Sequence, residues 1–511
     1  MKAAAVHDAS DVASRPNTLS QGPPRASNRT GSTCNGGGRQ RILFVTSEMV
    51  DYIKVGGLGD VSAALPRALR RRHDVRVLIP GYRDLIADLG EIPVVGRLGP
   101  LASLPACDVG KIETLDGVIV YVLLCPELYD RDGSPYTDAS GADWADNDIR
   151  FGRLGLAAAD IAYGLGDPTW MPNLIHLNDW PIALAPAYLA WRGRRTPSVM
   201  TIHNLAHRGL FSRERLEPLG IPASAFQING VEFCGDISFL KAGIFYASHV
   251  TTVSSTYAEE ITKPEFGFGL DGLLRSRARE GQLTGILNGI DESWDPKTDA
   301  HLASPFHVND WKGKDGNAEH VRNAFGLAVS RGPLFAVVSR LVHQKGVDLT
   351  IQATETIVRE GGQIVVTGRG EGRLETELQN LALRYPGNVG VKIGFDEGSA
   401  RRMFAGSDFL LMPSRFEPCG LSQMYAQRFG SLPVAHRTGG LADTIEDGVT
   451  GFLFNDLSLA GLLSAVYRSI DAFRSRPQLN AMRQAAMARS FGWQQSASDY
   501  TAVYDQAIGR A

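Results

Sequence analysis

Two glycine-bearing segments far apart in the chain carry residue types that bind anions. The first is KVGGLGDV, from Lys54 to Val61, and the second is PSRFEPCGL, from Pro413 to Leu421. Each follows an apolar, strand-like run and precedes a helix-like run, where backbone N–H groups can point at a ligand. The pair therefore predicts two binding edges, one on each of two sheets.

The Lys54 loop has the composition of a phosphate or sugar site. Its three glycines let the backbone approach a ligand closely, and the lysine adds a positive charge before a helix start. A flexible loop with a solvated lysine is the alternative. A dinucleotide fingerprint fits poorly, because Ser62 replaces its third glycine and the loop from Thr46 to Gly56 is too long for its tight turn.

Three further groups are expected at the same edge of a second sheet. Arg340 and Lys345 follow an apolar run and could clamp a diphosphate, although solvated surface cations are the simpler alternative. Glu417 falls at the irregular turn of PSRFEPCGL, where it is a ligand residue, a helix cap or half of an ion pair. Gly439 and Gly440 could present amide groups to phosphate in the same way.

Two histidines and one cysteine need a separate interpretation. His176 and His203 both fall at expected strand ends, facing a ligand edge, where sugar hydroxyls would be their partners. A lone histidine there is more often a core residue, and no third matched ligand indicates a metal. Cys419 is expected to pack rather than react, since no base accompanies it in sequence.

Composition excludes several classes of protein. A net charge of −3 argues against nucleic acid as the main partner, and no apolar stretch approaches the ~20 residues of a membrane-spanning helix. The five cysteines have neither disulfide-framework nor zinc-ligand spacing. A reducing cytoplasm is therefore the expected location.

The positioning elements are read from alternating strand-like and helix-like segments. With 511 residues, of which 43% are hydrophobic, the chain exceeds one ordinary core. Buried strands are expected at 42–46, 75–79, 118–124, 174–177, 198–202 and 249–253, then again at 334–338, 364–367, 389–393, 409–412 and 432–435. This pattern predicts an α/β protein with two doubly wound, Rossmann-like parallel sheets facing one deep cleft.

The predicted domain boundaries follow from this series. Residues 41–290 form the N-terminal Rossmann-like domain, 291–330 a polar linker and 331–490 the C-terminal domain, while 491–511 form a helix that crosses back to the first. Residues 1–40 are rich in Ser, Thr, Asn, Gly and Pro and are expected to be disordered. A plastid location would follow if this tail were a transit peptide, a reading that its two aspartates disfavour.

These motifs together resemble the bacterial glycogen synthase and plant starch synthase family, from about Arg41 to Gly509. The strings that carry the resemblance are, in order, KVGGLGDV, HLNDW, TIHNLAHRGLF, FLKAGI, TVSSTYAEEI, FGFGLDGLL, GILNGID, SRLVHQKG, PSRFEPCGL and RTGGLADT. The resemblance implies a GT-B type glycosyltransferase without inorganic cofactors. It would transfer glucose from ADP-glucose to the 4-hydroxyl at the non-reducing end of an α-1,4-glucan such as glycogen or a maltooligosaccharide, with retention of configuration.

The resemblance also implies roles for individual residues. Arg340 and Lys345 match residues that bind the donor diphosphate, Glu417 matches the contact to the transferred glucose, and Lys54 matches a lysine that reaches the donor. The catalytic set is then Lys54, His203, Arg340, Lys345 and Glu417. The donor site takes Gly56, Gly57, Asp60, Asn288, Phe395, Cys419, Gly420, Leu421, Thr438, Gly439 and Gly440, and the acceptor side takes Asp179.

Departures from the family pattern leave alternatives open. Phe395 stands where relatives often carry a tyrosine against the adenine, and it keeps the ring but loses the hydroxyl. His207-Arg208 replaces a common tyrosine-glutamine pair beside His203, so acceptor preference is the least secure expectation. The competing functions are a relative that uses UDP-glucose or another acceptor, and a non-catalytic glucan-binding relative. Retained charged residues at Lys54, Arg340, Lys345 and Glu417 disfavour the latter.

Overall fold

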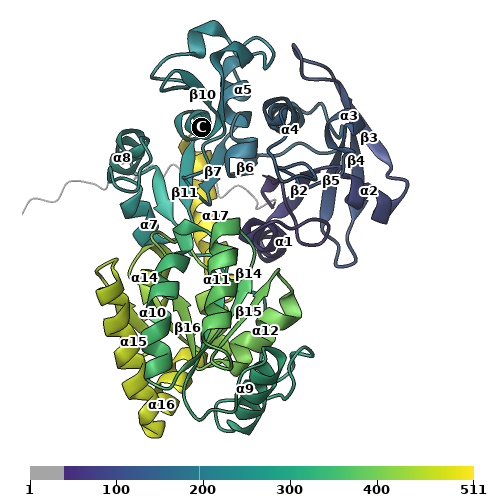
Figure 1. The fold of residues 1–511 in the computed structure, drawn as a ribbon. Helices are drawn as coiled ribbons and strands as arrows, with labels where there is room; N and C mark the ends of the chain where they lie inside the picture. The colour runs from purple at the N-terminus through teal and green to yellow at the C-terminus, as the bar shows by residue number, and fades with distance from the viewer. Residues whose placement is uncertain (1–38, 195, 511) are drawn as a thin grey trace, which may run out of the picture. The chain divides into compact units, whose positions relative to one another are not determined.

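The first sheet contains nine strands in the computed structural model, which describes residues 39–194 and 196–510 (Figure 1). Across the sheet their order is β12 (Leu283–Gly285), β11 (His249–Thr252), β7 (Ser198–Ile202), β6 (Leu174–Asn178), β1 (Arg41–Val45), β2 (Asp74–Pro80), β5 (Ile119–Leu124), β4 (Cys107–Glu113) and β3 (Val94–Leu98). The strands from β12 to β5 pair in parallel.

The edge of this sheet differs from the prediction of a purely parallel arrangement. Strands β3 and β4 pair antiparallel, and so do β4 and β5. Only Thr114 to Val118 separate β4 from β5, and such a connection is too short for the crossover that parallel strands require. The sheet is therefore mixed, with its parallel part at the centre.

The second sheet has six strands, all parallel. Their order is β15 (Val389–Ile393), β14 (Gln363–Gly368), β13 (Leu334–Val338), β16 (Phe409–Met412), β17 (Leu432–His436) and β18 (Phe452–Phe454). The direction of winding reverses between β13 and β16, the point where doubly wound sheets bind ligands. The predicted α/β class with Rossmann-like sheets is confirmed here.

Helices cover both faces of the sheets, and this covering buries the central strands throughout. The main ones are α1 (Gly57–Leu69), α2 (Arg83–Leu89), α4 (Asn147–Ala162), α5 (Ala185–Trp191), α6 (Phe239–Tyr246), α7 (Ser255–Glu260), α8 (Asp271–Arg279), α10 (Val347–Arg359), α11 (Gly372–Arg384), α12 (Glu397–Gly406), α13 (Ser422–Arg428), α14 (Gly439–Thr444), α15 (Leu459–Arg474) and α16 (Arg476–Met487). All residues of β13 and β14 are buried, as their apolar runs predicted.

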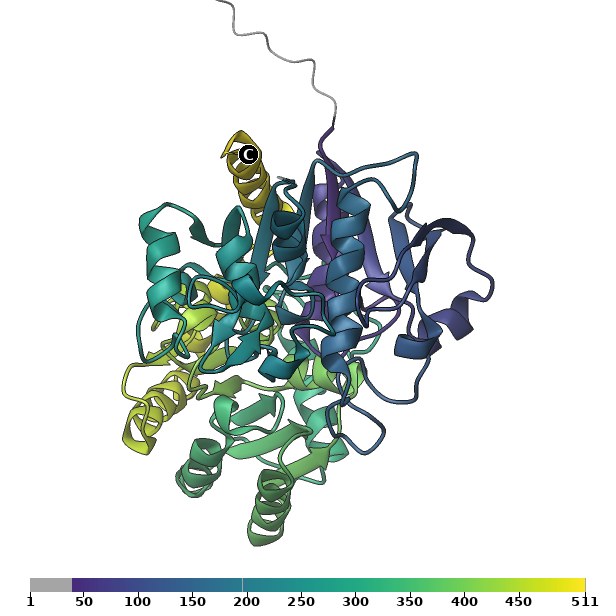
Figure 2. The ribbon, with the colours of Figure 1, turned by 90° about the horizontal axis from the view of Figure 1, so that it is seen from above.

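The final helix, α17 (Trp493–Arg510), packs against α1 and β7 of the first sheet although it follows the second in sequence (Figure 1). Its Tyr500 and Tyr504 belong to the core of the first sheet. Helix α1 connects β1 to β2, and α4 lies in the connection from β5 to β6, which crosses the sheet in the opposite direction. Because both crossovers are right-handed, α1 and α4 lie on opposite faces of the first sheet. Figure 2 shows α4 in front of these strands.

The stretch predicted as a linker contains a helix, α9 (Lys312–Ala324), that packs on α12. The buried Lys314 Nζ donates to Ala405 O at 2.9 Å and to Phe429 O at 2.8 Å. Trp294 stacks on Tyr425 with ring centroids 3.6 Å apart. These contacts attach the segment to the domain of the second sheet. The sequence did not predict α9 because its residues are mostly polar and give a weak helical periodicity. The domain boundaries themselves stay predictions, since Arg39–Ala511 pack as one compact unit.

The predicted tail, 1–40, lies outside the described residues except for its last two positions. Within the described part of the chain, no helix has the length and apolar character to cross a membrane.

Candidate active site

The Lys54 loop connects β1 to α1 and is organised by a buried carboxylate. Glu48 Oε2 accepts hydrogen bonds from the backbone N–H of Val55 at 2.6 Å and of Gly56 at 2.9 Å, while its Oε1 accepts from Tyr136 Oη at 2.6 Å. Lys54 Nζ pairs with Asp60 Oδ1 at 2.7 Å. Burial raises the pKa of Asp60, and the charge of Lys54 opposes that shift.

Arg340 and Lys345 both follow β13, in the connection that leads through Gly346 into α10. Gly346 has φ +67°, and a Cβ at this position would lie 2.0 Å from Pro413 O, so only glycine fits there. Arg340 is exposed and pairs with no carboxylate in the described part of the chain. It lies near His207: the His207 pKa is lowered mainly by burial, and then by the charge of Arg340.

Glu417 lies in the loop after β16, the strand next to β13, and both of its carboxylate oxygens accept hydrogen bonds. Lys345 Nζ lies 2.8 Å from Oε1 and 2.6 Å from Oε2, and Ser414 Oγ donates to Oε2 at 3.0 Å. Cys419 is buried, which raises the pKa of its thiol to about 12, so the thiol stays protonated at neutral pH. The amides of Gly420 and Leu421, just before α13, donate to no acceptor among the described residues.

The turn from Thr438 to Gly440 follows β17, and its amides are already bonded within the protein. Gly439 N donates to Glu260 Oε1 at 3.1 Å and Oε2 at 3.2 Å, and Gly440 N donates to Glu417 O at 3.0 Å. Thr438 Oγ1 also donates to Glu260, at 2.9 Å. The phosphate role predicted for these amides therefore stays a prediction that requires Glu260 to move.

His203 lies at the end of β7 in a position to accept a hydrogen bond. Asn178 Nδ2 donates to Val45 O at 3.0 Å, so its Oδ1 faces His203 Nε2, 3.0 Å away, and this ring nitrogen carries the proton. Burial lowers the His203 pKa to about 4. The ring is thus neutral at pH 7, with Nδ1 left as an acceptor.

The expectation that His176 faces a ligand edge is wrong. This residue is fully buried within β6, with Nδ1 2.7 Å from Tyr504 Oη and Nε2 2.7 Å from Thr201 Oγ1. Burial lowers its pKa to about 3. His176 is a satisfied core residue that anchors α17.

Asp179 and Asn288 carry buried side-chain oxygens without partners. Asp179 follows β6 with φ +65°, a left-handed conformation that costs energy outside glycine, and its pKa is raised to about 7 by burial. Its Oδ1, and Oδ1 of Asn288, accept no hydrogen bond within the described residues. Such atoms are rare in native structures and mark places where a ligand can complete the bonding.

The structure brings several predicted residues together across the two sheets. A Cβ on Gly57 would lie 3.5 Å from Leu421 Cδ1, so the two opening motifs approach one another. Ser254 Oγ, after β11, donates to Pro418 O at 2.6 Å. Phe395 is 64% exposed after β15 and makes no aromatic pair within the described part of the chain. Its predicted contact to adenine stays a prediction.

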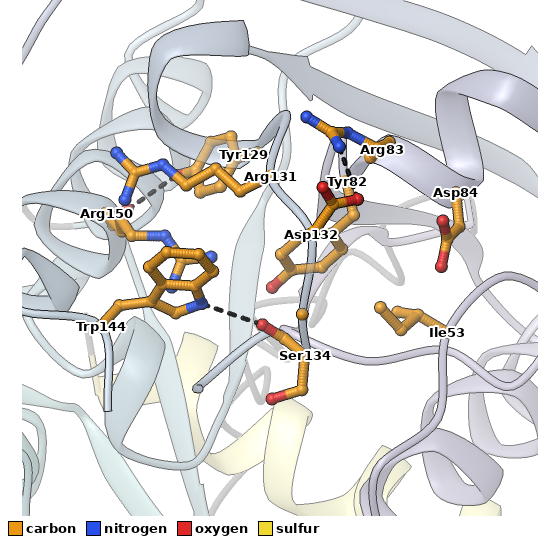
Figure 3. A pocket seen from close by; sticks show the side chains of 11 residues that line it. Ile53, Tyr82, Arg83, Asp84, Tyr129, Arg131, Asp132, Ser134, Trp144 and Arg150 are labelled. Carbon is orange, nitrogen blue, oxygen red and sulfur yellow. Dashed lines mark hydrogen bonds and ion pairs between the residues drawn. The ribbon is translucent and has the colours of Figure 1, made fainter. Parts of the chain in front are cut away.

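A separate pocket of about 220 Å³ lies beside the Lys54 loop and includes Ile53 (Figure 3). Its walls carry the rings of Tyr82, Tyr129 and Trp144, and Trp144 Nε1 donates to Ser134 O at 3.1 Å. None of the predicted site residues lines this pocket. It is therefore distinct from the group around Glu417.

Sequence reasoning missed the residues that hold the predicted ones in place. Glu48, Tyr136, Asn178, Ser414 and Glu260 all bond to a predicted side chain or its loop. The available signal was a charged residue next to a buried strand, as at Glu48. In the described part of the chain, no three His, Cys, Asp or Glu residues are grouped to hold a metal ion.

Comparison with known proteins identifies the family. Residues 41–276 match the family model "Starch synthase catalytic domain", and residues 323–473 match "Glycosyl transferases group 1". A glycogen synthase of Pseudomonas fluorescens is 60% identical over 93% of this chain and 91% of its own length. Glycogen synthase 1 of Bradyrhizobium diazoefficiens is 60% identical over 89% of this chain and 99% of its own.

Solved structures agree with the sequence relatives. The catalytic domain of starch synthase IV from Arabidopsis thaliana, bound to ADP and acarbose, superposes with a TM-score of 0.81 at 29% identity, covering 93% of this chain and all of that one. Sucrose-phosphate synthase from Thermosynechococcus elongatus, with a TM-score of 0.60 at 17% identity over 93% of this chain and all of its own, shares the fold. The predicted GT-B architecture is confirmed, and the chain belongs to the glycogen synthase family of glycosyltransferases.

Proposed function

We propose that this enzyme transfers glucose from ADP-glucose to the 4-hydroxyl at the non-reducing end of an α-1,4-glucan, with retention of configuration. The observation that carries the proposal is the group Arg340, Lys345 and Glu417 at the reversal point between β13 and β16. The relatives named glycogen synthase, and a starch synthase bound to ADP and acarbose, support the choice of donor and glucan.

The donor diphosphate is assigned to the side chains of Arg340 and Lys345 and to the backbone amides of Gly420 and Leu421. Arg340 has no carboxylate partner in the described chain and offers a planar fork to phosphate oxygens. The unbonded amides of Gly420 and Leu421 add donors before α13. Lys54, with Gly56, Gly57 and Asp60, is assigned to the first-sheet side of the donor, while Phe395 is assigned to the adenine.

The sugar is assigned to groups that still have bonding capacity. Glu417 accepts hydrogen bonds from hydroxyls of the transferred glucose, and Lys345 pairs with that carboxylate and holds it in place. Nδ1 of His203 and the unpartnered oxygens of Asp179 and Asn288 can accept hydrogen bonds from sugar hydroxyls. These buried acceptors favour a polyhydroxylated ligand over an apolar one.

The proposed reaction is a displacement on one face of the sugar. The bond between C1 of glucose and the phosphate oxygen breaks, the acceptor oxygen forms the new bond to C1, and the acceptor proton passes to the departing phosphate oxygen. Arg340 and Lys345 stabilise the charge that develops on that oxygen. No carboxylate acts as a nucleophile in this reaction, and no inorganic cofactor is needed.

The test is a comparison of two donors. With glycogen present, the purified chain should release ADP from ADP-glucose at least about tenfold faster than UDP from UDP-glucose, a discrimination of ~1.4 kcal/mol. The Lys345→Ala variant supplies the background rate. Preference for UDP-glucose would support the alternative donor, and glucan binding without nucleotide release would support a non-catalytic relative.

A further inference from the structure

The turn Thr438–Gly440 lies directly against the main chain that carries Glu417. A Cβ on Gly439 would lie 2.0 Å from Glu417 O, and one on Gly440 would lie 2.0 Å from Cys419 O. Gly440 N donates to Glu417 O at 3.0 Å. Because no side chain separates the two backbones, the position of Glu417 depends on where this turn sits.

Glu260 holds the turn from the side of the first sheet. It is the last residue of α7, only 8% exposed, and its carboxylate accepts from Thr438 Oγ1 and, with both oxygens, from Gly439 N. A charged acceptor forms stronger hydrogen bonds than a neutral one. The turn is thus fixed by a residue that lies 157 positions before Glu417 in sequence.

Two other residues of the same region bond to the same part of the second sheet. Ser254 Oγ donates to Pro418 O at 2.6 Å, and Thr256 donates to Asp443 through Oγ1 at 2.5 Å and through N at 3.1 Å. Residues 254–260 therefore hold Pro418 directly and its neighbours Glu417 and Cys419 through the turn.

We propose that Glu260 is a positioning residue for Glu417, acting through the Thr438–Gly440 turn. The inference rests on the proposed role of Glu417 at the transferred glucose. A phosphate on Gly439 N would have to displace a carboxylate of the same charge sign, so the phosphate charge falls to Arg340 and Lys345. Glu260 then governs the rate of transfer and not the affinity for ADP.

The experiment measures kcat with ADP-glucose and glycogen, and ADP affinity by calorimetry, in Glu260→Gln and Glu260→Ala. A misplacement of about 1 Å near the reacting groups can cost on the order of 100-fold. We expect kcat to fall roughly 100-fold in Glu260→Ala and about 10-fold in Glu260→Gln, which keeps one acceptor oxygen. The Kd for ADP should stay within about twofold of the wild-type value.

Glu259→Gln is the matched control, because Glu259 precedes Glu260 on α7 but is exposed. It should leave kcat unchanged. If the Glu260 variants do not fold, Thr438→Val keeps the side-chain shape, removes one of the bonds and should lower kcat about threefold, with ADP affinity unchanged.

Two results would overturn the inference. One is a kcat within twofold of wild type in folded Glu260→Ala, or in Thr438→Val if that variant alone folds. The other is a Kd for ADP that rises tenfold or more in the Glu260 variants, which would show that Glu260 supports phosphate binding. Wild-type enzyme that releases no ADP would instead overturn the proposed function. In that case, amide hydrogen exchange tests the Glu260 inference independently of activity. Glu260→Ala should speed exchange at 417–421 and 438–441. Unchanged exchange would contradict the inference.

Discussion

Lys345 Nζ lies 2.6 and 2.8 Å from the two carboxylate oxygens of Glu417. The two residues come from loops after β13 and β16, neighbouring strands at the reversal point of the second sheet. A pair this close couples the groups assigned to phosphate and to glucose. Removing either one therefore leaves the other without its ion-pair partner and free to change position.

Lys345→Ala and Arg340→Ala are both expected to lower turnover on the order of 10² to 10³-fold, because each removes charge stabilisation from the departing phosphate. Their effects on stability should differ. Lys345→Ala leaves the buried Glu417 without its counter-ion and should cost roughly 3 kcal/mol of the free energy of unfolding. Arg340→Ala removes an exposed side chain and should leave the melting temperature unchanged. Steady-state kinetics and thermal melts measure both.

The control for these variants is Arg373→Ala on α11, whose side chain is 71% exposed and pairs with Glu377. Neither turnover nor melting temperature should change in it. Near-normal turnover in a folded Arg340 or Lys345 variant would remove that residue from the catalytic set.

Asp179 predicts a pH dependence of stability. Its pKa is raised by burial to about 7, against 3.8 for the unperturbed group, so the stability that its neutral form provides is complete below about pH 4 and is lost as pH rises through 7. Asp179→Asn stays neutral, and because its side chain has nearly the same shape, the backbone strain at this position stays as in the wild type. The variant should therefore gain stability relative to wild type between pH 5 and pH 8, by at most about 2.7 kcal/mol. Melting curves at the two pH values test this, and an equal difference at both would contradict the raised pKa.

Glu48→Ala should disrupt the Lys54 loop without unfolding the protein. It leaves the amides of Val55 and Gly56 without their acceptor, which costs about 1–3 kcal/mol locally. The expected result is a KM for ADP-glucose raised about tenfold. Tyr136→Phe, which removes one bond to the same carboxylate, should raise KM less. An unchanged KM in Glu48→Ala would show that the loop does not depend on this residue.

Chelation should leave activity unaffected. In the proposed reaction Arg340 and Lys345 stabilise the negative charge of the phosphate. Dialysis against EDTA should therefore preserve kcat within the error of the assay. Activity that is lost on dialysis and restored by Mg²⁺ would require a metal-assisted step.

The sequence predicted those features that depend on local patterns. Continuous apolar runs located the central strands, and the glycines of both opening motifs located the loops that follow them. Features that depend on distant contacts were not predictable in this way. The contact that makes His176 a core residue comes from Tyr504, 328 positions away, and the partner of Gly439 is Glu260, 179 positions away. The antiparallel β3–β4 edge and α9 were missed because short connections and polar helix faces give weak periodic signals.

The central claim is transfer of glucose from ADP-glucose to a glucan with retention, and NMR of the product tests it most directly. ADP-glucose labelled with ¹³C at C1 is incubated with the enzyme and maltoheptaose. The account predicts a labelled anomeric signal of an α-1,4 linkage, appearing at the rate of ADP release and absent with Lys345→Ala. A β-anomeric signal, or labelled free glucose without chain extension, would contradict it.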